Sequence, residues 1–196
     1  MAKPPKLSQY GTREEWLVAL VNELRPDFQA QELEIPPVRV SCSWPSRSIR
    51  KTLGQCFGTK SAKDGIHQIV VSPAIGDVVQ IVETMVHELL HACLPDGTGH
   101  KAPFKRGMVK LGLEGKATAT HAGQTLLHHL HELCAKLGEY PHSALKLKDP
   151  AEKKQGTRLI KLTCPGCGYV LRTTQKWIET GLPTCACGEE FKQEEK

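Results

Sequence analysis

The chain has 196 residues, of which 39% are hydrophobic and 24% charged, and a net charge of +5. These values predict one core domain of ordinary size with a small additional module. No apolar run approaches the ~20 residues that a membrane helix needs. The N-terminal residues also lack the apolar core of a signal peptide, so we expect a cytoplasmic protein with no membrane segment. The mild positive charge permits nucleic-acid binding without requiring it.

The first predicted helix begins at Thr12 and ends at or just before Pro26. Thr12 and Glu15 have the spacing of a capping box. Apolar residues follow at helical intervals, and we interpret the aromatic ring of Trp16 among them as core: Trp16, Leu17, Leu20, Val21 and Leu24.

Three short strands are predicted at 38–41, 54–57 and 67–71, and we expect them to form a small antiparallel sheet. The last of the three is the clearest because β-branched residues dominate it. Basic side chains lie between the first two strands. We interpret them as a solvated face in preference to a contact with an acidic partner: Arg47, Arg50 and Lys51.

The next predicted helix, at 77–93, carries a His-Glu-x-x-His motif at His87, Glu88 and His91. Residues four apart lie on one face of a helix, so both imidazoles can bind the same metal ion. In this pattern the glutamate acts as general base and is not a ligand. Two helical histidines with ordinary packing are the simpler reading. The amphipathic helix and the retained glutamate argue against it.

A third ligand is available after the glycine-rich turn at 95–99. The eight residues between His91 and His100 span up to ~26 Å when extended, more than enough to return His100 to the metal. Asp96 and Glu114 compete with His100 for this role. We favour His100 because imidazole suits zinc.

Two further helices are predicted at 103–111 and 119–137. Gly107 should weaken the shorter one. The longer one carries histidines that we interpret as surface residues because no carboxylate or cysteine accompanies them at ligand spacing: His128, His129 and His131. His121, at the start of the same helix, is a candidate for a residue that lies near the site and positions a metal ligand without binding the metal itself.

Eight cysteines in a cytosolic protein indicate metal binding more than disulfides. Four of them match the knuckles of a zinc ribbon, although the second pair is C-x-C and not C-x-x-C: Cys164, Cys167, Cys185 and Cys187. A module of about forty residues needs such a metal to fold. The others are interpreted as small apolar residues: Cys42, Cys56, Cys93 and Cys134. A metal site at Cys42 and Cys56 would lack knuckle spacing.

The composition predicts a core domain at 1–146, a basic linker at 147–157 and the ribbon at 158–196. The linker is either a solvated spacer or a phosphate contact. Three basic residues of the ribbon are candidates for nucleic-acid contact: Lys161, Arg172 and Lys176. Tyr169 and Trp177 lie near them and suit base stacking. For Trp177 we favour a place in the ribbon's small core.

The chain from about residue 38 onward resembles the SprT-like metalloprotease family, which includes the Spartan-type proteases. The resemblance lies in Val-His-Glu-Leu-Leu-His-Ala at 86–92 and in His100 with Phe104 four residues later. The segments at 41–46 and 172–177 are similar to a phage and actinobacterial branch. One residue departs from the family pattern: Lys101 stands where a glycine often follows the third histidine, which alters the rim of the site.

The resemblance implies a zincin-like α+β domain, with helices packed on a small antiparallel sheet, followed by a β zinc ribbon. It implies two zinc ions: a catalytic one held by His87, His91 and His100, with Glu88 as base, and a structural one in the ribbon. The expected function is a metalloprotease acting on DNA-associated or DNA-crosslinked proteins, with DNA bound through ribbon and linker, in a bacterial or phage-infected cytoplasm. The alternatives are a non-catalytic zinc protein that binds nucleic acid or transcription machinery, and a metal-dependent hydrolase of another bond.

Overall fold

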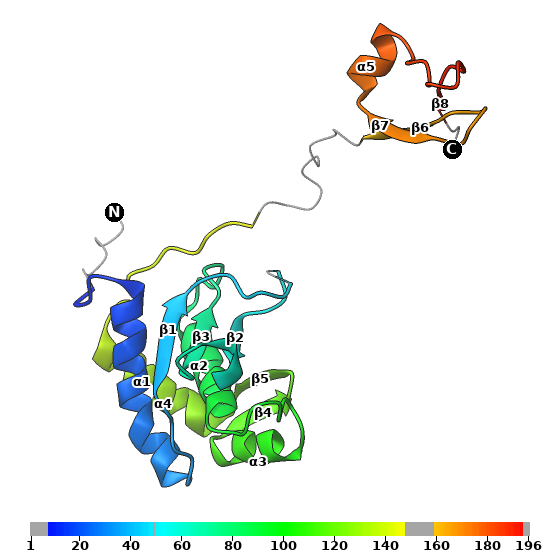
Figure 1. The fold of residues 1–196 in the computed structure, drawn as a ribbon. Helices are drawn as coiled ribbons and strands as arrows, with labels where there is room; N and C mark the ends of the chain where they lie inside the picture. The colour runs from blue at the N-terminus through cyan, green and yellow to red at the C-terminus, as the bar shows by residue number, and fades with distance from the viewer. Residues whose placement is uncertain (1–7, 49, 148–158, 194–196) are drawn as a thin grey trace, which may run out of the picture. The chain divides into compact units, whose positions relative to one another are not determined.

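The structure is a computed structural model that describes residues 8–48, 50–147 and 159–193. The chain divides into two compact units, Met1–Leu147 and Lys148–Lys196 (Figure 1). Apart from Leu147 the predicted linker lies outside the described residues. The first unit mixes helices with small sheets and the second is mostly β, which confirms the α+β class. None of the described helices combines the length and apolarity that a membrane span requires.

Helix α1 (Arg13–Ala30) begins at the predicted capping box. Thr12 Oγ1 accepts from the Glu15 backbone N–H at 3.2 Å, and Glu15 Oε2 accepts from the Thr12 backbone N–H at 3.1 Å. Pro26 does not end the helix as predicted but lies inside it. The last turn persists because it buries Phe28 completely, which offsets the hydrogen bond that proline removes. Trp16 is fully buried, as predicted.

The first sheet contains β1 (Val38–Cys42), β2 (Gly54–Phe57) and β3 (His67–Val71) in the order β1-β3-β2. β2 is antiparallel to β3, but β1 runs parallel to it, so the prediction of a wholly antiparallel sheet is wrong. β1 and β2 therefore occupy opposite edges of the sheet, with β3 between them. Alternation of side chains indicates which face of a strand is buried and says nothing about its direction. A single 3₁₀ turn, η1 (Thr59–Ser61), follows β2.

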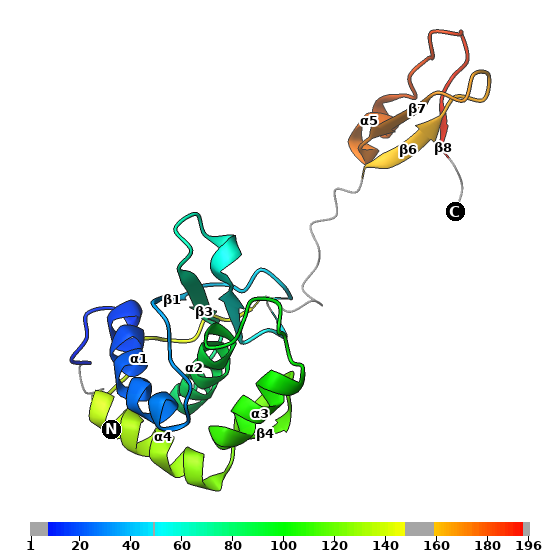
Figure 2. The same cartoon turned by 60° about the horizontal axis from the view of Figure 1, so that its bottom comes forward.

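Two helices pack on this sheet, and a third packs on those two (Figures 1 and 2). α1 contacts β1, while α2 (Val78–Ala92) contacts β2 and β3. α4 (Gln124–Leu137) contacts both α1 and α2. Most of α2 is buried, so its backbone is held rigidly between the sheet and α4: Ile81, Val82, Thr84, Met85, Val86, Glu88, Leu89, Leu90 and Ala92. The His-Glu-x-x-His motif thus sits on the most constrained element of the unit.

The segment after α2 forms α3 (Ala102–Lys110) and a hairpin of β4 (Leu113–Lys116) and β5 (Ala119–Ala122). The prediction of one helix over 119–137 is therefore wrong for its first residues. Residues 119–122 form a strand that pairs with β4 and are not part of α4. Backbone pairing between the two short strands outweighs the helix-forming preference of alanine here.

Gly107 in α3 fulfils a packing requirement. A Cβ atom at this position would lie 2.5 Å from Leu90 Cδ1. Since only glycine avoids that collision, it allows α3 to approach α2 closely enough to cover the metal motif. Glycine does lower the helix propensity of α3, as predicted, but the close contact with α2 that it permits compensates for this cost.

The second unit contains β6 (Ile160–Thr163), β7 (Val170–Thr173) and β8 (Lys192–Gln193) in the order β7-β6-β8, with a short helix α5 (Gln175–Thr180). Its core consists of Leu162, Cys164, Cys185 and Phe191. Trp177 is 59% exposed, so its predicted place in this core is wrong. Ile178, the next residue of α5, packs on the core instead and turns Trp177 outward.

Candidate metal centres and the adjoining cleft

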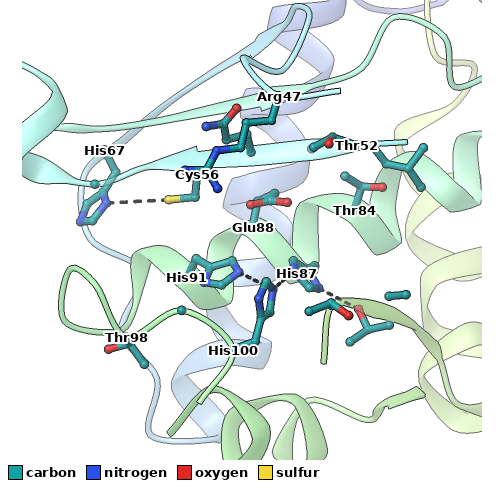
Figure 3. A pocket seen from close by; sticks show the side chains of 18 of the residues that line it. Arg47, Thr52, Cys56, His67, Thr84, His87, Glu88, His91, Thr98 and His100 are labelled. Carbon is teal, nitrogen blue, oxygen red and sulfur yellow. Dashed lines mark hydrogen bonds between the residues drawn. The ribbon is translucent and has the colours of Figure 1, made fainter. Parts of the chain in front are cut away.

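Three imidazoles converge at one point of the first unit: His87 and His91 from α2, and His100 from the loop before α3 (Figure 3). His87 Nε2 and His91 Nε2 each lie 3.2 Å from His100 Nε2. Nitrogens bound to one tetrahedral zinc ion at about 2.0–2.1 Å lie about 3.3–3.4 Å apart. The donor set therefore fits a single metal ion such as zinc.

The two competitors of His100 are engaged elsewhere. Asp96 accepts hydrogen bonds from Thr59 Oγ1 at 2.6 Å and from the Thr59 backbone N–H at 3.3 Å. Glu114 lies 3.9 Å from His121 Nε2, at the exposed end of the hairpin. Of the three candidates only His100 joins the helix histidines, because the turn at 95–99 folds back over α2.

Thr120 of β5 contacts His87 at Nδ1, the ring nitrogen that faces away from the other two imidazoles. The Nδ1 atom of His87 lies 2.8 Å from Thr120 Oγ1. A neutral imidazole that offers Nε2 to a metal carries its proton on Nδ1, so Nδ1–H donates to the threonine hydroxyl. The sequence prediction assigned this supporting role to His121. His121 instead lines the cleft with an exposed side chain, and its Nε2 lies 3.9 Å from Glu114 Oε2. A correct strand assignment at 119–122 would have pointed to Thr120.

Phe104 of α3 forms an apolar floor beneath the three imidazoles. Its ring centroid lies 4.3 Å from that of His91, stacked at 28°, and 4.9 Å from those of His87 and His100. Phe104 is fully buried and keeps water from this side of the group. Desolvation, together with the neighbouring imidazoles, lowers the pKa of His87 to about 3 and of His91 to about 4. Both rings are therefore neutral at physiological pH, the state that binds metals.

Glu88 lies between β2 and the three histidines (Figure 3) and is only 7% exposed. Burial raises the pKa of its carboxyl to about 8, against a smaller opposing effect of a hydrogen bond from the Cys56 backbone. A carboxyl of this kind can take up and release a proton near neutral pH. A Cβ at Gly54 would lie 2.9 Å from Glu88 Cγ and 2.5 Å from Thr84 Cγ2. Glycine is therefore needed for β2 to pass so close over the carboxyl.

A cleft of about 920 Å³ opens onto these groups. One wall is β2 with the chain on either side of it, the floor is α2, and the other walls are the loop at 95–100 and the β4–β5 hairpin. The cleft thus exposes three convergent nitrogens that could hold a metal ion, and a buried carboxyl beside them, to an external molecule. This arrangement is chemically able to activate water for hydrolysis.

A second ligand group lies in the ribbon. All four thiol sulfurs lie within 4.8 Å of one another, and none is in a disulfide: Cys164, Cys167, Cys185 and Cys187. Two pairs join the two knuckles, at 3.4 Å between Cys164 and Cys187 and 3.5 Å between Cys167 and Cys185. Sulfurs around one zinc ion lie about 3.8 Å apart, given bonds of about 2.3 Å. The short C-x-C knuckle therefore still supplies both thiols. The backbone N–H of Cys167 lowers the pKa of Cys164 to about 7, which favours the thiolate that metals bind.

The remaining cysteines are partly buried and pack on the core of the first unit: Cys42, Cys56, Cys93 and Cys134. Cys42 lies 3.4 Å from Arg13 Nη1, and Cys56 Sγ lies 3.9 Å from His67 Nδ1. Within the described ranges no third group of ligand atoms converges as the two above do. The histidines of α4 lie at the surface as predicted, with His129 Nε2 2.8 Å from Asp27 Oδ2.

The ribbon's candidate nucleic-acid residues lie at its surface or close to it. Lys161 and Arg172 are direct partners across β6 and β7, so their side chains leave the same face of the sheet. Lys176 Nζ lies 5.4 Å from the ring of Trp177. Tyr169 is 63% exposed and Trp177 59%. The structure thus leaves two aromatic rings accessible on the same small module as these basic groups.

The functional interpretation follows from the chemistry of the two ligand groups and of Glu88. No protein-family model matches the chain, and no curated protein matches it.

Proposed function

We propose that this chain is a zinc-dependent metallopeptidase with a zincin-like, SprT-like catalytic domain, and that it cleaves proteins bound or crosslinked to DNA. One observation carries the proposal: three convergent imidazoles, two of them from α2, and a buried carboxyl, also from α2, face an open cleft. A purely structural metal site needs neither the carboxyl nor the opening.

Each residue of the group has a definable task. A zinc ion held by His87, His91 and His100 supplies a Lewis acid that polarises the scissile carbonyl. Glu88 takes the proton from the attacking water and delivers it to the leaving amine. Burial raises the pKa of this carboxyl in the metal-free protein, and a zinc ion bound beside it would favour the carboxylate form that accepts the proton. Thr120 holds the ring of His87 in the orientation that these steps need.

Strand β2 is the natural place for the substrate backbone. It is an outer strand of its sheet, it lines the cleft, and Gly54 keeps its near end free of side-chain bulk. An extended peptide can add to such an edge through main-chain hydrogen bonds, which read no particular side chain. Substrate choice would then depend on the surroundings of the cleft and on the second unit.

The ribbon is the proposed contact with DNA. Exposed Tyr169 and Trp177 offer stacking surfaces, and Lys161, Arg172 and Lys176 offer charge to phosphates. Binding of this kind weakens steeply as salt concentration rises. The same features favour the alternative function, a non-catalytic zinc protein that binds nucleic acid or transcription machinery, and only a cleavage assay separates the two.

The test uses the full-length zinc-loaded protein and a protein substrate crosslinked to single-stranded DNA. We expect fragments from the parent protein and none after addition of a chelator. Glu88→Gln should keep both zinc ions and lose cleavage. A Glu88→Gln protein that cleaves as fast as the parent contradicts the mechanism. A parent protein that binds DNA, retains two zinc ions and yields no fragments supports the alternative.

A further inference from the structure

One wall of the cleft is cationic. Arg47 and Lys51 from the connection between β1 and β2, and Lys60 from η1, line the cleft with exposed side chains. Figure 3 shows Arg47 beside β2, on the same side of the cleft as Cys56 and Glu88. The positive charge is therefore next to the strand along which we place the substrate backbone.

The acidic side chains of the cleft form no ion pair with this wall. Asp96 is occupied by Thr59 and by the Lys60 backbone N–H, and Glu83 accepts from the Ala122 backbone N–H at 2.7 Å. Glu88 is buried over α2. Throughout the described ranges, no carboxylate lies within ion-pair distance of the side chains that form the wall: Arg47, Lys51 and Lys60.

The backbone next to Arg47 is anchored to β2. The residue before Arg47, Ser46, donates through its backbone N–H and its hydroxyl to Gln55 Oε1 on β2, at 2.8 and 2.9 Å. This double hydrogen bond ties the β1–β2 connection to the strand. Because the backbone next to Arg47 is already ordered, ligand binding by Arg47 costs less conformational entropy.

We propose that Arg47, assisted by Lys51, makes the enzyme select protein segments with an acidic side chain next to the scissile bond. This inference rests on the peptidase function proposed above and identifies its substrate class. A guanidinium binds a carboxylate through two parallel hydrogen bonds, and such charge-assisted contacts are stronger than neutral ones. A peptide carboxylate is favoured over a DNA phosphate because the cationic wall lies within the catalytic cleft itself, beside Glu88.

The test compares two series of fluorogenic peptides in which glutamate or glutamine is placed at each position flanking the cleavage site. We expect the parent protein to cleave the best glutamate peptide at least ~10-fold faster, in kcat/KM, than its glutamine twin. Arg47→Gln should abolish that ratio, and Arg47→Glu should favour lysine at the same position. Arg106→Gln is the matched control, since Arg106 is exposed on α3 and does not line the cleft.

A binding measurement separates failure of this inference from failure of the peptidase function. Fluorescence anisotropy of the labelled glutamate peptide on Glu88→Gln protein should weaken at least ~10-fold when Arg47→Gln is added. Cleavage of both peptides with no glutamate preference overturns the inference and leaves the peptidase intact. Absence of any cleavage removes the peptidase, and the anisotropy then decides whether the wall binds carboxylates. Equal affinity for the two peptides together with Arg47-dependent binding of single-stranded DNA assigns the wall to phosphate and overturns the inference.

Discussion

Replacing Thr120 by valine tests whether the metal site depends on the β4–β5 hairpin. The substitution exchanges the hydroxyl for a methyl group of similar shape and removes the acceptor that lies 2.8 Å from His87 Nδ1. The hairpin backbone has no reason to move, because β5 pairs with β4 through its main chain. The change therefore isolates one hydrogen bond to one ligand.

The size of the effect follows from the surroundings of His87. Its ring is largely desolvated, which is also why its pKa is low. A buried N–H without a partner costs about 1–3 kcal/mol, and a lost partner behind a metal-bound histidine typically weakens metal binding about 10–100-fold. We expect the dissociation constant for zinc at the three-histidine site to rise by about 10–100-fold, with the ribbon site unchanged.

The assay is a zinc titration of metal-free protein in competition with a chromophoric chelator, which resolves two binding equivalents. Thr118→Val serves as the control because Thr118 is exposed in the same hairpin and also borders the cleft. Thr120→Ser should restore affinity by returning the hydroxyl. If Thr120→Val protein is folded and binds its second zinc within about twofold of the parent, Thr120 does not orient His87 and the reasoning from the hydrogen bond fails.

Two further predictions concern the core unit's acid stability and the ribbon. The Nδ1 atom of His142 accepts a hydrogen bond from Arg13 Nη1 at 3.1 Å, and its Nε2–H donates to the Pro73 carbonyl at 3.0 Å. Tyr140 packs beside the ring. Burial and the Arg13 charge lower the pKa of His142. The ring is therefore neutral in the fold and protonates first in the unfolded chain, so its contribution to stability is present above pH ~6.5 and is lost as the pH falls toward its folded pKa. Urea unfolding at pH 7.5 and pH 5 should show a smaller acid loss for His142→Gln than for the parent, and equal losses would refute the linkage. Trp177→Ala should weaken binding of single-stranded DNA by about 1–3 kcal/mol without lowering the melting temperature, because the ring is 59% exposed; unchanged affinity would exclude stacking on Trp177.

Helix α2, which carries the histidine motif, was predictable because its signals are local. Asp77 caps α2 by accepting from the Val79 backbone N–H at 3.2 Å, and apolar residues recur at helical spacing until Cys93. The i, i+4 relation of His87 and His91 is a property of any helix. The ribbon knuckles are equally local, since each pair of cysteines lies within a few residues of its partner.

Contacts between distant segments were less predictable. The parallel pairing of β1 with β3 and the pairing of β5 with β4 depend on which strand edge is free when the core closes. The outward position of Trp177 depends on competition with Ile178 for a very small core. Sequence periodicity indicates a preferred face, but it does not rank two neighbouring apolar residues for one buried place.

The sequence by itself determined the chemistry available to this protein: two imidazoles and a carboxyl on one helical face, a third histidine within reach, and four thiols in two knuckles. The tertiary structure decided how that chemistry is used. It brought Thr120 behind His87 across 33 residues, placed Gly54 over Glu88, and set Arg47 on the wall of the cleft. The division has a physical reason. Bonds within one helical turn are fixed by backbone geometry, whereas contacts between segments form only where burial of the whole core makes them favourable.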